Sequence, residues 1–219
     1  TYNATDDIAT DGYIAGKSYS GGAAVGFQYD GRGNLASTTG PTGTTTYVYD
    51  SDDRLTRATS PGGRAFDITY DGAGRRTSLV DQLGYEINYE YNANGSLYRL
   101  TDGTASLIVQ YSYNDAGWPA ERTLGNGCRS TYAYNSTGDI SSLINYAPDD
   151  SVISRFDYDY DANGLCTSVE TSLGDWTYEY DASGRLTHAV FDSSGGSVAD
   201  QDLSYEYDGA GNLTRTVRN

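Results

Sequence analysis

Short stretches of the chain alternate apolar or aromatic residues with polar ones. In Ile87–Tyr91 and Trp176–Tyr180 every second side chain is apolar, and the residues between them are polar. A period of two places the apolar side chains on one face of a β-strand. The same alternation is found in Val25–Tyr29, Phe66–Tyr70, Val109–Tyr113, Phe156–Tyr160 and Leu203–Tyr207. Long runs with helical spacing are absent from the sequence, so the pattern predicts an all-β protein.

Each of these strands ends in a tyrosine that begins a turn motif. An Asp or Asn follows the tyrosine, a Gly stands three residues later, and an apolar residue two places beyond the Gly opens the return strand. Asp and Asn side chains can bond the backbone ahead of them, and Gly supplies the positive φ that closes a hairpin. At positions 6 and 53 an Asp replaces the Gly, which the left-handed region tolerates. The motif therefore predicts a tight β-hairpin.

The motif recurs along the whole chain. Its tyrosine stands at positions 2, 29, 49, 70, 91, 113, 134, 160, 180 and 207, and the copy at Tyr2 is truncated. Six of the nine steps span 20–22 residues, and three carry about six residues more. Such a period is typical of a repeat architecture, and we predict about ten hairpins, or about twenty antiparallel strands, paired edge to edge as a continuous curved or spiralling strip over residues 1–219. The residues assigned to the motif are Tyr29, Asp30, Gly33, Tyr49, Asp50, Tyr70, Asp71, Gly74, Tyr91, Asn92, Gly95, Tyr113, Asn114, Gly117, Tyr134, Asn135, Gly138, Tyr160, Asp161, Gly164, Tyr180, Asp181, Gly184, Tyr207, Asp208 and Gly211.

The return strands and the second turns follow the pattern less strictly. Arg76 and Pro119 replace the apolar residue that opens a return strand, so we expect irregular strands there. Other return strands place a second apolar residue three positions on, as Leu100 follows Leu97, which is out of phase and predicts a bulge. The second turn of each repeat should be looser, and longer loops or lengthened hairpins are expected near 12–24, 147–154 and 192–202.

Composition supports this interpretation and narrows the choice of partners. The chain has 22 Tyr and 27 Gly, residues of strands and turns, with 4 Phe and no Met. A net charge of −16 repels phosphate backbones and anionic lipid, so nucleic acid and membrane surfaces are poor partners. No stretch approaches the roughly 20 apolar residues of a membrane span. The absence of Met, even at position 1, suggests a piece of a larger protein.

The motif copies resemble a known family. YEYDASGRL from Tyr178 and YEYDGAGNL from Tyr205 look like the RHS/YD repeats of bacterial polymorphic-toxin and wall-associated proteins, insecticidal toxin-complex shells and teneurins. The resemblance covers essentially the whole chain. It implies hairpins that pair into a strip forming the wall of a hollow shell, in some members around a toxic C-terminal domain. No segment resembles the core that closes such shells, so self-cleavage and toxicity are assigned to no residue here.

Candidate chemistry outside the repeat is sparse. Asp-rich turns such as Asp50–Asp53 could hold calcium, but turn carboxylates usually bond their own backbone. Cys128 and Cys166 should lie three strand spacings apart, about 14 Å, too far for a disulfide. His188 is the single histidine. We therefore assign no catalytic residue, cofactor or metal site, and expect a protein that is not an enzyme.

The sequence therefore favours a structural role. We expect part of the β-sheet wall of a hollow shell in a secreted or cell-surface protein, which could enclose or deliver a toxin. The expected partners are adjoining repeats of the same or another copy, with an encapsulated toxin domain or surface glycans as further candidates. Two alternatives stay open. One is an adhesion or carbohydrate-binding module that uses exposed Tyr and Trp residues such as Trp118 and Trp176, or the long loops. The other is a filament or tube that assembles through open β-edges.

Overall fold

A computed structural model describes residues 4–8, 12–19, 24–196 and 198–218, and it is all β. Twenty strands lie in two compact units, 1–107 and 108–219, which we describe separately. The first unit contains β1 (Ala4–Ile8), β2 (Ile14–Tyr19), β3 (Ala24–Tyr29), β4 (Leu35–Gly40), β5 (Gly43–Tyr49), β6 (Leu55–Thr59), β7 (Ala65–Tyr70), β8 (Arg76–Asp81), β9 (Glu86–Tyr91) and β10 (Leu97–Asp102). The second contains β11 (Leu107–Tyr113, from Ile108 on), β12 (Pro119–Leu124), β13 (Arg129–Tyr134), β14 (Ile140–Tyr146), β15 (Val152–Tyr160), β16 (Cys166–Thr171), β17 (Gly174–Tyr180), β18 (Leu186–Ser193), β19 (Gln201–Tyr207) and β20 (Leu213–Arg218).

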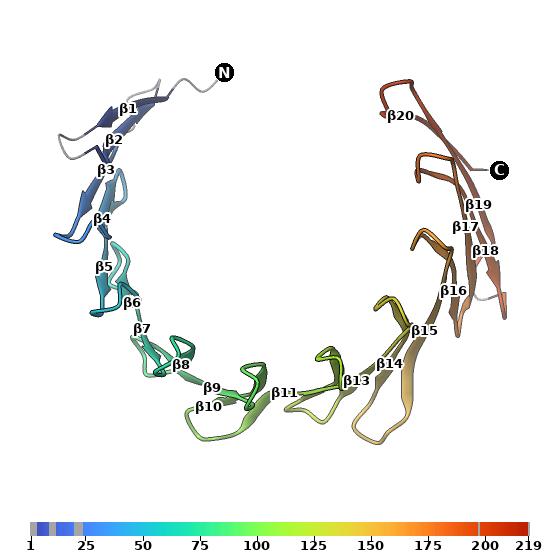
Figure 1. Ribbon diagram of the computed structural model, residues 1–219, viewed down its shortest axis with the longest axis horizontal. Coiled ribbons are helices and arrows are strands. Elements are labelled where there is room, and N and C mark those ends of the chain that lie inside the picture. Colours follow the sequence, from blue (N-terminus) through green and yellow to red (C-terminus); the bar gives the residue numbers. More distant parts are fainter. Residues whose placement is uncertain (1–3, 9–11, 20–23, 197, 219) are drawn as a thin grey trace. The chain divides into compact units, whose positions relative to one another are not determined.

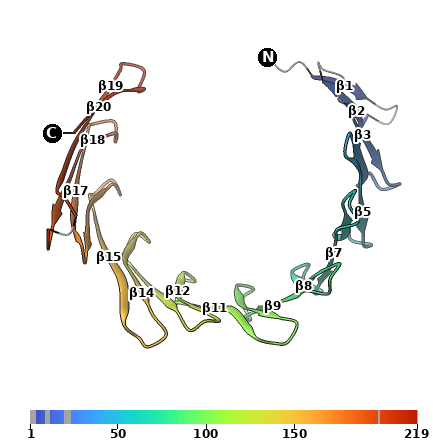
Figure 2. The same ribbon diagram turned by 180° about the vertical axis from the view of Figure 1, so that it is seen from behind.

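Within each unit the strands form an antiparallel meander. Every strand pairs with the next one along the chain, from β1 to β10 and from β11 to β20. Neighbouring strands therefore lie side by side in sequence order (Figures 1 and 2). As a result, all Tyr–Asp turns of a unit lie on one side of its sheet, at one end of the strands, and the second turns lie at the opposite end of the strands. The expected order of hairpins is confirmed within each unit.

A β-bulge recurs in every Tyr–Asp hairpin. In the β3–β4 pair Tyr29 faces Leu35 and Gln28 faces Ser37, so Ala36 has no residue opposite it. The same shift occurs in the other eight hairpins of this type. One extra residue returns the next apolar side chain to the same face, which explains the three-residue apolar spacing. The predicted bulge is confirmed.

The two return strands that were expected to be irregular are regular. Arg76 opens β8 opposite Tyr70, and Pro119 opens β12 opposite Tyr113, each in the register of the other repeats. That prediction was wrong because the turn and the strand pairing set the backbone at this position, whereas the side chain there stays exposed.

The predicted position of the first hairpin turn was also wrong. Tyr2 lies outside the described residues, and Asp6 lies within strand β1 rather than in a turn. The hairpin instead joins Ile8 to Ile14, with Gly12 at φ 87° and the usual bulge. Ile8 precedes Tyr29 by 21 residues, which matches the regular repeat length. Part of the segment 12–24 is therefore the return strand β2.

Several second turns are as regular as the Tyr–Asp turns, contrary to expectation. In five of them the first N–H donates to the carbonyl four residues on, and the fourth N–H donates back to the first carbonyl. These turns begin at Ser60, Asp81, Asp102, Leu124 and Ala147. Two others are two-residue connections, Gly40 to Gly43 and Thr171 to Gly174. In the long repeat near 147–154, β15 extends to nine residues and lengthens the hairpin.

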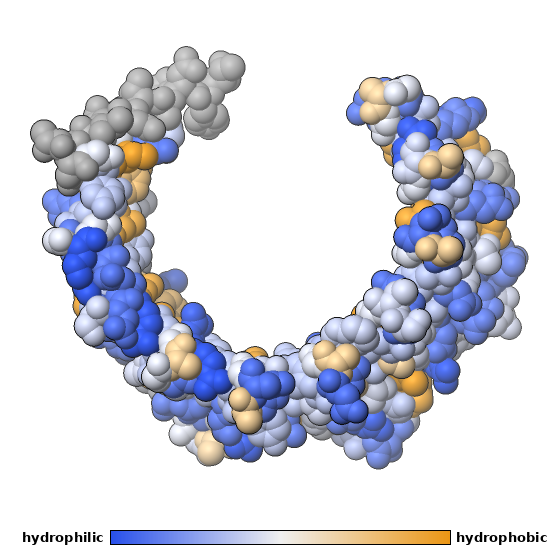
Figure 3. All heavy atoms as spheres, viewed as in Figure 1, coloured by the Kyte–Doolittle hydropathy of each residue, from blue (hydrophilic) through white to orange (hydrophobic). Residues whose placement is uncertain are grey.

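Burial is shallow because each unit is a single layer of sheet. The most enclosed apolar side chains are Ala65, Val109, Ala189 and Phe191, at 2–7% exposure. Figure 3 shows hydrophobic residues singly or in small groups among hydrophilic ones. With so little core, contacts between neighbouring repeats must provide much of the stability.

Candidate functional site in the Tyr–Asp turns

The Asp or Asn of each motif organises its turn. At Asp161 one carboxylate oxygen accepts the N–H groups of Asn163 and Leu165 at 2.8 and 2.9 Å. The backbone N–H of Gly164 donates to the Asp161 carbonyl at 3.0 Å, and Gly164 has φ 81°. All nine motif Asp or Asn residues accept the N–H four positions on. At Asp53, which replaces the turn glycine, φ is 61°, as expected for a left-handed substitute.

These bonds hold the turn carboxylates in their charged form. The backbone N–H of Leu165 is the main cause that lowers the pKa of Asp161. The Arg185 side chain, which lies 2.6 Å from the carboxylate, is the main cause for Asp181. The carboxylates of Asp30, Asp71 and Asp208 also have lowered pKa values, for the same kinds of reason. The turn aspartates are thus acceptors used by their own hairpin.

The motif tyrosine connects one repeat to the one before it. The hydroxyl of Tyr180 donates to the carbonyl of Cys166, the first residue of the preceding return strand, at 2.7 Å. Seven more tyrosines make the equivalent bond, at 2.8–3.1 Å: Tyr29, Tyr49, Tyr70, Tyr91, Tyr134, Tyr160 and Tyr207. Tyr113 occupies the corresponding place at the end of β11. The hydroxyl therefore ties each hairpin to its predecessor.

A second connection comes from the residue that follows the positive-φ turn residue, which we call the exit residue. Arg54, Arg75 and Arg185 place their guanidinium groups over the motif tyrosine of the next repeat, 4.6–5.0 Å from the ring centroid. Trp118 and Tyr13 contact the next tyrosine ring with centroids 5.0 and 4.7 Å apart. In these five repeats the exit residue therefore covers the next tyrosine from the side of the preceding turn.

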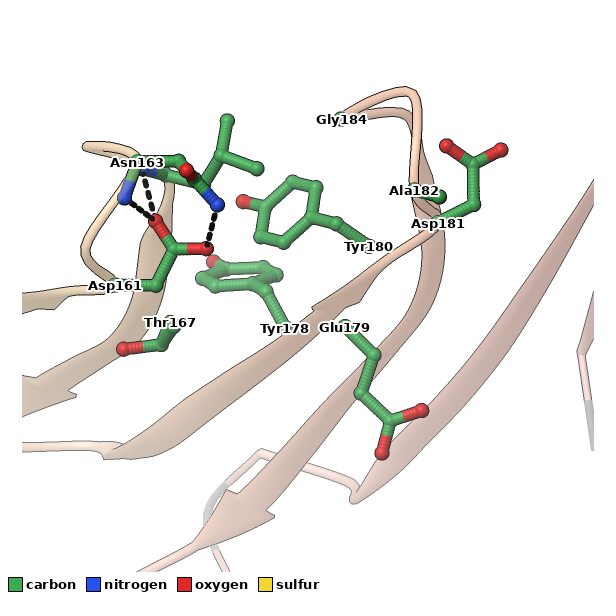
Figure 4. A pocket seen from close by; sticks show the side chains of 10 residues that line it. Asp161, Asn163, Thr167, Tyr178, Glu179, Tyr180, Asp181, Ala182 and Gly184 are labelled. Atoms are coloured by element: carbon green, nitrogen blue, oxygen red, sulfur yellow. Dashed lines mark hydrogen bonds between the residues drawn. The ribbon is translucent and has the colours of Figure 1, made fainter.

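Two consecutive Tyr–Asp turns of the second unit have open grooves beside them. One groove, of about 780 Å³, is lined by Asp161, Asn163, Leu165, Thr167, Tyr178, Glu179, Tyr180, Asp181, Ala182 and Gly184. Figure 4 shows the two tyrosine rings of this groove between the Asp161 turn and the Asp181 turn. The other groove, of about 580 Å³, lies one repeat earlier and is lined by the corresponding residues, from Asn135 to Gly164. The grooves are thus one feature repeated.

The remaining candidates from the sequence do not form a reaction centre. Nε2 of His188 lies 2.7 Å from Asp202 on the next strand, and Nδ1 lies 3.8 Å from Glu179 on the preceding one. Among the residues that the structure describes, no three His, Cys, Asp or Glu side chains are grouped to hold a metal ion. Cys166 opens β16 and Cys128 immediately precedes β13. The described part of the chain contains no helix of the length and apolarity that a membrane crossing requires.

The alternation and the turn motif located the tyrosines, aspartates and glycines but not their partners in the neighbouring repeat. The acceptor of each hydroxyl is a main-chain carbonyl, which carries no residue preference. The exit residues did leave a signal, because Arg or an aromatic residue stands there in five turns. An alignment of the repeats on the turn glycine would have revealed this preference at the exit position.

Comparison with known proteins places these features in context. The family model described as RHS Repeat matches residues 18–65 and 160–197. The tRNA3(Ser)-specific nuclease WapA of Bacillus spizizenii is 33% identical over 158 residues, which cover 69% of this chain and 6% of that protein. The double-stranded DNA deaminase toxin A of Burkholderia cenocepacia is 29% identical over 147 residues, covering 66% of this chain and 10% of the toxin. The chain thus spans a small part of these relatives.

Solved structures share the fold. The crystal structure of TcdB2-TccC3 matches 99% of this chain with a TM-score of 0.72 at 16% identity. The Tc holotoxin pore of Photorhabdus luminescens matches 98% with a TM-score of 0.66, also at 16% identity. In both cases the match covers 15% of the other chain. At this identity the likeness concerns the fold alone.

Proposed function

The chain belongs to the RHS-repeat family, and from that premise we propose that it forms part of the β-sheet wall of a hollow shell in a large exported protein. The tyrosine hydrogen bonds between repeats carry this proposal. They tie each hairpin to the one before it through a main-chain acceptor, so the same connection can be repeated in an array of any length. In this role the whole chain is one continuous array.

The chemistry of the turns supports a structural role rather than catalysis. The turn carboxylates, the most regular polar groups in the chain, accept hydrogen bonds from their own turn and have lowered pKa values. A general acid or base at neutral pH needs a pKa near 7. In this proposal the chain is not an enzyme, and the motif residues stabilise the turns and the pairing of successive hairpins.

The relatives suggest what such a wall would enclose or carry. WapA and the deaminase toxin are named for activities on tRNA and DNA, and this chain matches a small fraction of each. We propose that the parent of this chain likewise carries a toxin within or beside its shell, and that it acts outside the producing cell. The partners would be adjoining repeats and that toxin segment.

Imaging the whole parent protein tests the proposal. By cryo-electron microscopy the purified parent should show a closed hollow wall in which these hairpins are consecutive. An extended, open array in the parent would contradict the shell. In that case size-exclusion chromatography of the 219-residue chain would be the next measurement, because high-order assembly would favour the filament alternative.

A carbohydrate-binding role is the second candidate, and one feature favours it. The rings of Trp176 and Tyr178 are nearly parallel, at 2° with centroids 6.0 Å apart, beside an apolar groove of about 310 Å³ that includes Phe156 and Phe191. Parallel aromatic faces suit sugar rings. Glycan-array binding by the chain that disappears in Trp176→Ala, with unchanged circular dichroism, would support this role.

A further inference from the structure

The exit arginines show how the space between two Tyr–Asp turns is filled within this chain. Arg185 lies 4.8 Å over the Tyr207 ring, 2.6 Å from the Asp181 carboxylate of its own turn and 3.5 Å from the Asp208 carbonyl of the next turn. Arg54 has the same three contacts in the first unit, with the Tyr70 ring, Asp50 and the Asp71 carbonyl. An arginine is therefore a fitting occupant of this position.

In two consecutive repeats the chain supplies no such group. The exit residues there are Asp139 and Leu165, and the open grooves lie at these repeats. The carboxylate of Asp139 turns back onto Thr137 of its own turn, at 2.7 Å. Leu165 reaches to within 3.7 Å of the place that a Cβ on Gly184 would take, but it carries no charge. Tyr160 and Tyr180 thus line grooves that an arginine fills elsewhere.

We propose that these two grooves bind arginine side chains from a partner polypeptide. A guanidinium group would stack on the Tyr160 or Tyr180 ring, as Arg185 does on Tyr207, and would meet the turn carbonyl and nearby carboxylates. Apart from the tyrosines, the ionisable residues that line the grooves are all acidic: Asp139, Asp159, Asp161, Glu179 and Asp181. The charge is therefore complementary to a cation and repels an anion.

The spacing of the grooves specifies the partner further. One repeat is two strands wide, or about 9.6 Å at ~4.8 Å per strand. A segment in the polyproline II conformation rises about 3.1 Å per residue and returns its side chains to the same side every three residues, so arginines three positions apart would reach both grooves. The expected partner is an extended segment with the pattern Arg-x-x-Arg. This inference stands whether or not the array forms a shell.

Calorimetric titration of the 219-residue chain tests the inference. The probe is the acetylated and amidated peptide Gly-Arg-Gly-Ser-Arg-Gly, compared at low salt with versions carrying lysine or the uncharged analogue citrulline. We expect saturable binding of one arginine peptide per chain. The lysine peptide should bind about fivefold more weakly because it lacks the planar group, and the citrulline peptide should not bind. Equal binding of the arginine and citrulline peptides would overturn the inference.

A variant in which the chain itself supplies the arginine tests the groove directly. Leu165→Arg gives the Asp161 turn the residue that Arg185 provides in the Asp181 turn, so the chain should fold and bind the peptide at least about fivefold more weakly. Ala210→Arg adds the same charge in a turn outside the grooves, at the place of Arg32 in its turn, and should leave binding unchanged. Undiminished affinity in Leu165→Arg, with native circular dichroism, would refute the site.

Discussion

Removing one motif hydroxyl measures how much the connection between repeats contributes to stability. Tyr180→Phe deletes the donor of the 2.7 Å bond to the Cys166 carbonyl and leaves the ring in place. A partly buried neutral hydrogen bond contributes about 1 kcal/mol net. The corresponding bond of Tyr160 lies one repeat away, roughly 10 Å, with a different acceptor. The double variant Tyr160→Phe/Tyr180→Phe should therefore lose about 2 kcal/mol, because distant sites add.

Urea unfolding followed by tryptophan fluorescence suits this measurement. Both tryptophans of the chain, Trp118 and Trp176, lie in the second unit, so the signal reports the unit that carries the substitutions. Tyr132→Phe is the matched control, because the Tyr132 hydroxyl has no hydrogen-bond partner among the described residues. Its loss should be under about 0.5 kcal/mol. If Tyr180→Phe and Tyr132→Phe cost the same, the hydroxyl does not tie the repeats together and the proposed basis of the array fails.

Three further predictions follow from the turns and their charges. Burial is the main cause that raises the pKa of Tyr49, Tyr160 and Tyr180. The stability that these neutral hydroxyls contribute is therefore complete below pH 10, and it should be lost as the pH rises through their pKa values in the folded protein. Circular dichroism between pH 8 and 12 measures this loss. The lowered pKa of Asp161 and Asp181 contributes stability above about pH 4 that disappears as pH falls through the folded values. Acid unfolding of Asp161→Asn should be shifted to lower pH, whereas a midpoint equal to that of the unsubstituted chain would exclude the carboxylate as a cause. Ala105 holds φ 64°, so Ala105→Gly should stabilise the first unit by about 0.5–1 kcal/mol in thermal unfolding, and a decrease would contradict the strain.

Local chemistry made much of this fold predictable. The alternation of residues such as Trp176, Tyr178 and Tyr180 encodes a strand with one apolar face, and Asp161 with Gly164 encodes the turn within four residues. Even the bulge left a trace, in the three-residue spacing of Leu97 and Leu100. These features depend on neighbours in the sequence, so the sequence contains the information needed to infer them.

The errors occurred where strand pairing, not the local motif, sets the backbone. The first hairpin has Ile8 in place of the tyrosine and no Asp after it, yet it forms because β1 pairs with β2 and Gly12 closes the turn. The strands that begin at Arg76 and Pro119 keep their register because both flanking strands impose it. In each case the hydrogen-bond ladder outweighed an unfavourable side chain.

By itself the sequence determined the repeat, its strands and its Tyr–Asp turns, because each of these is fixed by residues within about ten positions of one another. The tertiary structure alone decided which carbonyl receives each tyrosine hydroxyl and which exit residue covers which ring. These contacts join residues 14–22 positions apart that meet only after the strands pair. The two open grooves were likewise decided by the tertiary structure. Asp139 and Leu165 are recognised as leaving a space only by comparison with an arginine such as Arg185, which fills the corresponding space in another repeat.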